Sequence, residues 1–278
     1  MFTLNCKGKI VSIEKPLLMG IINITADSFY KGYLDKDIDV ILQLAAEMIK
    51  EGADILDIGG QSTKPGSKQL SVEEETQRVL PVIEAIHRKF PDTIISIDTF
   101  HSKVASAAVH AGASIVNDVS AGNMDEDMIA TVASLRVPYI CMHMKGTPET
   151  MQLQPHYENL TREILDFFIA KIAECKTAGI KDIIIDPGFG FGKTITHNFE
   201  LLKNLSIFKM LELPILAGLS RKSTIYKTLK IDVSEALNGT TVLNTIALLN
   251  GANILRVHDV KEAKETILLI NRYKNAAE

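Results

Sequence analysis

Polar side chains capable of hydrogen bonding follow several short apolar runs of this sequence. Asp98, Asn117 and Asp186 each close such a run, and Lys222 comes a few residues after another. The carboxylates and the amide offer acceptors and donors that suit a planar heterocycle with amidine-like N–H groups, while a lysine suits a ring carbonyl oxygen. Taken singly, each acid is explained equally well by a helix cap or a loop hydrogen bond. Taken together, they predict a site for a flat, nitrogen-rich ring.

A second set of residues suits an anion. Arg256 can hold phosphate oxygens with two parallel hydrogen bonds, and His258 follows two residues later. Ser223 is expected near the start of a helix, where its hydroxyl, the free backbone N–H groups and the helix dipole favour a carboxylate or a phosphate. The predicted anion-binding residues are Asn23, Thr63, Arg256 and His258.

The glycine-rich run at 188–194 is not a nucleotide-binding loop. A phosphate-binding P-loop needs a glycine five positions before Gly192, and Pro187 occupies that position. The run reads G-x-G-x-G, which also departs from the dinucleotide-binding fingerprint. The sequence has no His-x-x-x-His pair, and its 3 cysteines are spaced unlike any metal or redox motif. These observations argue against zinc and nucleotide chemistry.

The elements that must position these residues are strands and helices in regular alternation. Continuous short apolar runs are typical of strands buried on both faces. Helical spacing of apolar residues occupies the segments between them, and the first such segment, 38–49, is followed by Gly52 as a stop signal. Ser71 with Glu74, and Asp259 with Glu262, read as capping boxes that start two later helices. The predicted strands are 17–22, 55–58, 94–97, 114–116, 137–142, 183–185, 213–217 and 254–257.

Repeated strand–helix units of this kind predict an α/β protein, a parallel (β/α)₈ TIM barrel, in one domain over residues 1–278. Residues 2–14 alternate weakly and are expected to form a short hairpin that closes the barrel bottom. A doubly wound open sheet is the competing architecture. In a barrel, the carboxyl ends of all the strands converge on one face, so the polar residues that follow them are expected to share a site.

Composition narrows the class of partners. The chain has 278 residues, of which 46% are hydrophobic and 23% charged, the balance of an ordinary globular protein. Its net charge of −4 lacks the basic character expected of a nucleic-acid-binding protein. Apolar runs fall short of the roughly 18 residues of a membrane span, and the first residues do not read as a secretory signal. We therefore expect a cytoplasmic protein with small-molecule partners, and neither nucleic acid nor membrane.

With these residues laid out, the chain resembles the dihydropteroate synthases of folate biosynthesis. The likeness runs from about Leu17 to the last predicted helix. Each motif alone is modest, but their order, with one at each strand end, is specific to the family. The matching segments are 19–25, 57–60, 97–99, 116–119, 142–148, 186–194, 218–223 and 256–259.

The resemblance implies an enzyme, a transferase that joins (7,8-dihydropterin-6-yl)methyl diphosphate to 4-aminobenzoate and releases pyrophosphate. It implies catalytic roles for Asp98, Asp186, Lys222 and Arg256. It further implies that Mg²⁺ bridges to the diphosphate through Asn23, and that the protein is a homodimer formed by the outer helices near the sixth to eighth strands.

The resemblance also divides the substrate contacts among three subsites. Asp98, Asn117, Asp186, Lys222, Met142 and Phe189 are implied for the pterin. Asn23, Thr63, Arg256 and His258 are implied for the diphosphate. Phe29, Thr63, Lys64, Phe189, Lys222 and Ser223 are implied for the 4-aminobenzoate.

Two loops depart from the family pattern. Ala26 stands where proline is usual and Lys31 where an acid is usual, while Gln61 replaces an acid and Lys64 an arginine. One interpretation is drift without consequence; the other is altered handling of aminobenzoate or of sulfonamides, testable by restoring Lys31→Asp with Lys64→Arg. The loop changes also keep open a non-catalytic pterin or folate binder. A barrel that presents methyltetrahydrofolate to a corrinoid protein is a further alternative.

Overall fold

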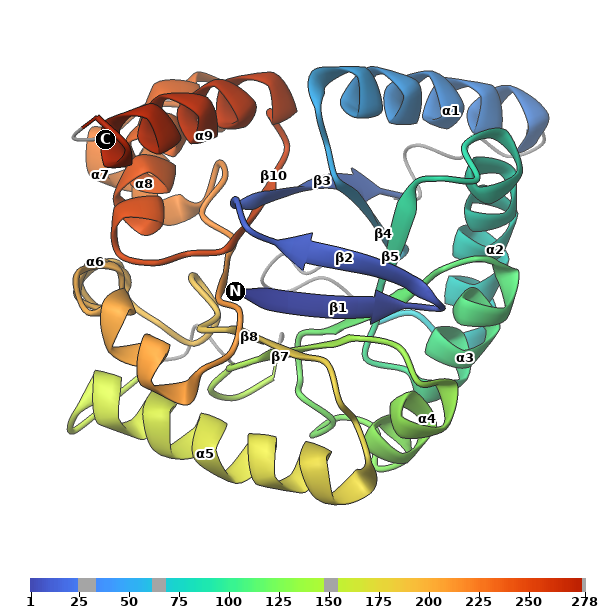
Figure 1. The fold of residues 1–278 in the computed structure, drawn as a ribbon, viewed down its shortest axis with the longest axis horizontal. Helices are drawn as coiled ribbons and strands as arrows, with labels where there is room; N and C mark the ends of the chain where they lie inside the picture. Colours follow the sequence, from blue (N-terminus) through green and yellow to red (C-terminus); the bar gives the residue numbers. More distant parts are fainter. Residues whose placement is uncertain (25–33, 62–68, 148–154, 277–278) are drawn as a thin grey trace.

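The fold is a closed barrel of parallel strands surrounded by helices (Figure 1). The computed structural model describes residues 1–24, 34–61, 69–147 and 155–276. Strand order in the 8-stranded sheet is β8-β7-β6-β5-β4-β3-β10-β9, and a parallel bridge between Ile185 and Ile215 joins the two ends of that order. The prediction of a (β/α)₈ barrel is confirmed. None of the described helices is long and apolar enough to cross a membrane.

Each predicted apolar run forms a strand of the barrel. The seventh is shorter than predicted, because Pro214 has no N–H to donate and the N–H of Ile215 donates to Asn253 Oδ1 over 2.9 Å. The barrel strands are β3 (Leu17–Asn23), β4 (Ile55–Gly59), β5 (Ile94–Asp98), β6 (Ile115–Asp118), β7 (Tyr139–Met142), β8 (Ile183–Asp186), β9 (Leu216–Ala217) and β10 (Ile254–Val257).

The helices form an outer ring around these strands (Figure 1). They are α1 (Leu34–Glu51), α2 (Val72–Lys89), α3 (Ser102–Ala111), α4 (Met128–Leu135), α5 (Leu160–Ala178), α6 (Ile195–Lys203), α7 (Ser223–Leu229), α8 (Leu237–Leu249) and α9 (Val260–Lys274). Two 3₁₀ helices, η1 (Leu205–Leu211) and η2 (Val233–Glu235), lie in the connections before β9 and α8.

One predicted capping box is confirmed and the other is wrong. At α2, the N–H of Glu74 donates to Ser71 Oγ over 3.2 Å, and the N–H of Ser71 donates to Glu74 Oε2 over 3.0 Å. Asp259 precedes α9, but its side chain caps none of that helix's N–H groups in the described structure. Its carboxylate accepts hydrogen bonds from Arg221 instead. Forgoing a helix cap costs about 1 kcal/mol.

The predicted hairpin is confirmed, and it closes one end of the barrel. β1 (Phe2–Cys6) and β2 (Lys9–Ile13) pair antiparallel, with Phe2 opposite Ile13, and lie across the barrel (Figure 1). Leu4, Cys6 and Ile13 are buried against apolar residues at the beginnings of the barrel strands. This end of the barrel is filled by an apolar cluster that consists of Leu17, Met19, Ile55, Ile94, Ile115, Ile140, Ile184, Leu216 and Ile254.

Candidate active site

Strand alternation places the predicted site residues inside the barrel. Successive side chains of a strand point to opposite faces, so residues two apart share a face. Ile184 belongs to the apolar cluster inside the barrel bottom, whereas Ile183 and Ile185 pack in the cluster under the helices. Asp186, two residues beyond Ile184, therefore points inward at the opposite end. The same relation puts Asp57, Asp98, Asn117 and Arg256 inward on their strands.

Arg256 is the centre of a buried charged cluster. Its Nε donates to Asp57 Oδ2 and its Nη2 donates to Asp98 Oδ2, each over 2.6 Å. Asn117 Nδ2 also donates to Asp57 Oδ2, over 3.1 Å. These contacts use two of the five N–H groups of the guanidinium, so Arg256 retains donors with which to meet an anion.

Asp57 is a site residue that sequence reasoning missed. It is completely buried, and its Oδ1 has no hydrogen-bond partner in the described structure. An unpaired buried carboxylate oxygen is costly and is typical of functional sites. The available signal was an acid in the middle of the apolar run 55–58, at a position that faces the barrel interior.

Burial and crowding of carboxylates shift the proton affinities of this cluster. Burial raises the pKa of Asp98 to about 7, Arg256 opposes that shift, and Asp57 adds to it. Burial alone lowers the pKa of Arg256, but Asp57 and Asp98 more than compensate and hold it above its usual range. Arg256 is therefore cationic, while Asp98 can change its protonation state near neutral pH.

Asp186 and Lys222 form the other polar side of the site. Asp186 Oδ1 accepts from the N–H of Gly188 over 2.8 Å. Lys222 Nζ donates to the carbonyl oxygen of Phe189 and lies 4.8 Å from the centre of the Phe191 ring. Burial raises the pKa of Asp186, opposed by Lys222. Burial lowers the pKa of Lys222 to about 8, opposed by Asp186.

A small apolar cluster lies beside these polar groups. Phe100, Val119 and Met142 are buried together, with Phe191 packed against them. Met142 was predicted to contact the ring, and it occupies this cluster. Phe189 was predicted as well, but its side chain is fully buried in the core under the helices and its carbonyl meets Lys222. Its contact with a substrate stays a prediction, and Phe191 is the aromatic residue that pattern reasoning missed.

Lys193 ties two loops at the strand ends together. It is 2% exposed, and its Nζ donates to the carbonyls of Gly188 and Phe191 over 2.9 and 3.0 Å and lies 3.0 Å from His143 Nδ1. Gly188 has φ +72°, and a Cβ there would lie 2.0 Å from the carbonyl oxygen of His143. Lys193 therefore stabilises a turn through its hydrogen bonds to backbone carbonyls, and it does not act as the lysine of a phosphate-binding loop.

The predicted anion-binding residues lie at the same end of the barrel where the structure describes them. Asn23 is exposed at the last position of β3, and Ser223 is the first residue of α7. Burial lowers the pKa of His258 to about 4, with Arg256 acting in the same direction. Five residues named in the sequence predictions lie outside the described residues: Ala26, Phe29, Lys31, Thr63 and Lys64.

A family model described as "Pterin binding enzyme" matches residues 19–258. The chain is 41% identical over 274 residues to the dihydropteroate synthase of Escherichia coli, covering 98% of this chain and 96% of the relative. The chain thus belongs to the pterin-binding enzyme family. Within it, the chain is a member of the dihydropteroate synthase family.

Solved structures agree with that membership. A Xanthomonas albilineans dihydropteroate synthase with 4-aminobenzoic acid superposes with a TM-score of 0.91 at 38% identity, covering 98% of both chains. The enzyme of the same species in complex with 7,8-dihydropteroate superposes with a TM-score of 0.88 at 36% identity, covering 99% of both. The likeness therefore extends over the whole barrel.

Proposed function

We propose that this protein is a working dihydropteroate synthase. It joins (7,8-dihydropterin-6-yl)methyl diphosphate to 4-aminobenzoate and releases pyrophosphate and 7,8-dihydropteroate. The observation that carries the proposal is the convergence of Asp98, Asn117 and Asp186 on one buried cluster that also contains Arg256 and Lys222. A ring-binding set and an anion-binding set share one barrel end, as a substrate with a ring and a diphosphate requires. The family's structures with 4-aminobenzoic acid and with the product support the same reaction.

The charges in the site suit a dissociative displacement. The C–O bond to the diphosphate breaks with its electron pair on the leaving group, and positive charge develops on the pterin methylene and ring. The carboxylates of Asp98 and Asp186 stabilise that cation, while Arg256 and His258 stabilise the diphosphate. The amine nitrogen then forms the C–N bond and loses a proton to solvent. Charges fixed in advance in a buried site commonly supply the largest share of catalysis.

The residues present fit a magnesium ion at the diphosphate end. A Cβ at Gly59 would lie 3.6 Å from both Asn23 Oδ1 and Asp98 Oδ2, so the glycine leaves a hollow edged by two oxygen atoms. Mg²⁺ prefers oxygen ligands and usually combines one or two protein groups with substrate phosphates. Asn23 would hold the ion, which when bound would neutralise charge on the leaving diphosphate.

For the aminobenzoate, the described residues supply Lys222 and Ser223 at the start of α7. A lysine ammonium and a hydroxyl suit a carboxylate. The remaining predicted residues of this subsite, Phe29, Thr63 and Lys64, lie outside the described residues.

The decisive experiment mixes the purified protein with the pterin diphosphate, 4-aminobenzoate and Mg²⁺. Release of pyrophosphate that requires both organic substrates is expected, in step with formation of 7,8-dihydropteroate. A non-catalytic binder would take up the pterin without releasing pyrophosphate. A methyltransferase barrel would bind methyltetrahydrofolate, and binding of that ligand without pyrophosphate release would favour that alternative.

We further propose that the protein is a homodimer across α6, η1 and α8. The α8 end lies against α6, since Asn250 Nδ2 donates to the carbonyl of Leu202 over 2.8 Å. Exposed apolar side chains gather on these elements, which is typical of a protein interface. They are Phe199, Ile207, Met210, Val242, Ile246 and Leu249.

Sedimentation analysis tests this interface. Ile246→Lys is expected to produce a monomer, because it places a charge in the apolar face. Val40→Lys on α1, where Val40 is 62% exposed, is the matched control and is expected to leave the dimer intact. A monomeric parent protein at micromolar concentration would contradict the proposal.

A further inference from the structure

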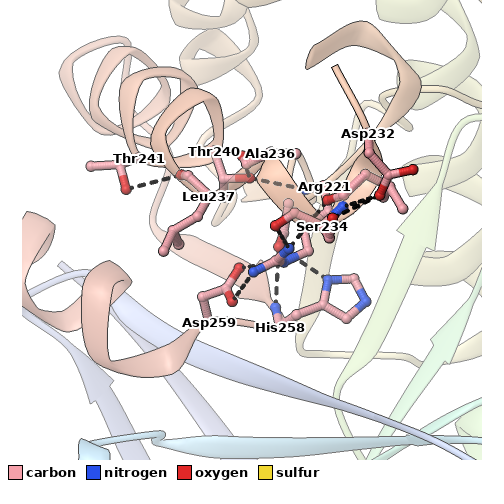
Figure 2. A network of polar contacts seen from close by, with 11 residues as sticks. Arg221, Asp232, Ser234, Ala236, Leu237, Thr240, Thr241, His258 and Asp259 are labelled. Atoms are coloured by element: carbon pink, nitrogen blue, oxygen red, sulfur yellow. Dashed lines mark hydrogen bonds and ion pairs between the residues drawn. The ribbon is translucent and has the colours of Figure 1, made fainter. Parts of the chain in front are cut away.

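One ion pair joins the two loops that carry Lys222 and His258 (Figure 2). Arg221 Nε and Nη2 donate to Asp259 Oδ2 and Oδ1 over 2.9 and 2.7 Å. Arg221 directly precedes Lys222, and Asp259 directly follows His258. A two-point contact between a planar guanidinium and a carboxylate fixes orientation as well as distance. The pair therefore constrains both the orientation and the separation of the two loops at this point.

Further contacts hold Arg221 in place. Its Nη1 donates to the carbonyl oxygens of Val233 and Ser234 over 3.2 and 2.8 Å. Its backbone N–H donates to Thr240 Oγ1 over 3.0 Å, and its φ of +52° lies in the left-handed region that disfavours residues with a side chain. These contacts thus hold the backbone in a turn at Arg221, and that turn sets the position of the Lys222 backbone.

Asp259 forgoes a role that its position offers. It stands at the N-cap of α9, where an aspartate normally accepts hydrogen bonds from the first N–H groups of the helix. In the described structure its carboxylate caps no such group, and both of its oxygens accept from Arg221. The Asp259 carboxylate therefore links the two loops instead of capping the helix start.

A second contact joins the same loops. Ser220 Oγ accepts from the backbone N–H of His258 over 3.2 Å and lies 3.0 Å from His258 Nδ1. When the Ser220 hydroxyl donates its proton to Nδ1, the proton of the neutral ring is on Nε2. Burial and Arg256 lower the pKa of His258 to about 4, so the ring is neutral near pH 7. His258 then presents an Nε2–H donor, as binding of a diphosphate oxygen requires.

We propose that the Arg221–Asp259 pair is a clamp that holds the Lys222 loop and the His258 loop at a fixed separation. Both clamp residues are positioning residues, since their side chains contact protein groups. The clamp rests on the proposed function, because only a substrate with its ring at one loop and its diphosphate at the other needs that separation. An error of about 1 Å in such positioning can lower a rate by about 10²-fold.

The test compares ligands that use one loop with the substrate that uses both. In Arg221→Gln and in Asp259→Asn, kcat/KM for the pterin diphosphate is expected to fall about 10- to 100-fold. The double variant is expected to be no worse than the poorer single variant, because both remove one contact. Calorimetric affinities for inorganic pyrophosphate with Mg²⁺, and for 6-hydroxymethylpterin, are expected to change less than about threefold, since neither probe spans the loops.

Two further variants sharpen the result. Arg221→Lys keeps the charge but lacks the planar fork, so it is expected to remain impaired. Arg162→Gln with Asp166→Asn removes an exposed ion pair of the same residue types on α5, and turnover is expected to stay at the parent level. Unchanged kcat/KM in both clamp variants, or equal losses for the separate probes and the spanning substrate, would overturn the clamp.

Failure of the proposed function gives a different result. If the parent protein releases no pyrophosphate, the clamp is judged on amide hydrogen exchange of segments 218–223 and 256–259. Faster exchange at both segments in Asp259→Asn, with the rest of the barrel unchanged, supports the clamp. Unchanged exchange at both contradicts it.

Discussion

The two ends of the barrel are built from the same strands but differ in chemistry. At the closed end, inward positions are apolar and mostly isoleucine, and they are buried against the hairpin. Two residues further along five of these strands, the inward positions are polar or charged. Ile55, Ile94, Ile115, Ile184 and Ile254 are followed by Asp57, Ser96, Asn117, Asp186 and Arg256. Two residues along an alternating strand therefore separate a layer that stabilises the fold from a layer that forms the candidate active site.

The difference lies in what burial does to each layer. Burying apolar area contributes about 25 cal/mol per Å², so the closed end stabilises the barrel without special geometry. Burying Asp57, Asp98 and Arg256 carries a desolvation cost that is offset only while their mutual contacts are kept. The closed end should thus tolerate conservative changes with small, additive losses. The open end should respond sharply, in activity as well as stability.

Arg256→Gln is expected to have the largest effect. Removing the cation leaves Asp57 and Asp98 buried beside each other, and breaking such a pair costs about 3–5 kcal/mol of unfolding free energy. Pyrophosphate release should fall by at least about 10²- to 10³-fold, because charge on the leaving group loses its main partner. Urea denaturation and the release assay measure the two losses. A stability loss below about 1 kcal/mol would mean that the cluster behaves like an exposed salt bridge.

Asp98→Asn should separate activity from stability. Turnover is expected to fall about 10²- to 10³-fold, because a carboxylate that faces the developing cation is replaced by a neutral amide. The pKa of Asp98 is raised to about 7 in the folded protein. Between its ordinary value and about 7, the folded state holds a proton that the unfolded state has lost, so unfolding free energy falls as pH rises through that window.

The Asn variant removes this dependence. Its melting temperature relative to the parent protein should therefore rise from pH 4 to pH 7 and stay level above that. Parallel melting curves at every pH would contradict the assignment, as would near-normal turnover.

The sequence predicted the closed end of the barrel more completely than the open end. Apolar runs and period-two alternation depend on local pattern, and they predicted the strands and the closing hairpin. Asp98, Asn117 and Asp186 were predicted because each ends a run, where a polar residue stands out. Asp57 was missed because it lies inside an apolar run. Its role depends on the contact with Arg256, which lies on a strand far along the chain.

Lys193 and Asp259 teach the same point from loops. Lys193 donates to backbone carbonyls of turns, and no local sequence pattern predicts these contacts. Asp259 with Glu262 matched a capping box in the sequence, but a long-range partner, Arg221, competes for the carboxylate and wins. Local signals predict local contacts well, and they fail where a functional site draws a residue to a distant partner.

Ile184→Val tests the closed end with the least disturbance. Removal of one methylene from a buried site is expected to lower the unfolding free energy by about 0.5–1.5 kcal/mol. The kcat should stay at the parent value, because the change lies one layer below Asp186. Urea denaturation and steady-state kinetics at a temperature where both proteins are folded provide the comparison. A clear fall in kcat would show that the two layers are mechanically coupled and that their roles are not separate.

The pH dependence of the open end probes its charges without disturbing its packing. Burial lowers the pKa of Lys222 to about 8, so its ammonium is present below that pH and lost above it. If the charge assists turnover, kcat/KM of the parent protein should fall as pH rises through about 8, by about tenfold from pH 7 to pH 9. Lys222→Arg keeps its charge throughout this range, so its profile should stay flat even where its overall rate is lower. If kcat/KM of Lys222→Arg falls between pH 7 and pH 9 as it does in the parent protein, the titrating group is not Lys222. Lys222 and Asp186 would then act through hydrogen bonding and not through charge.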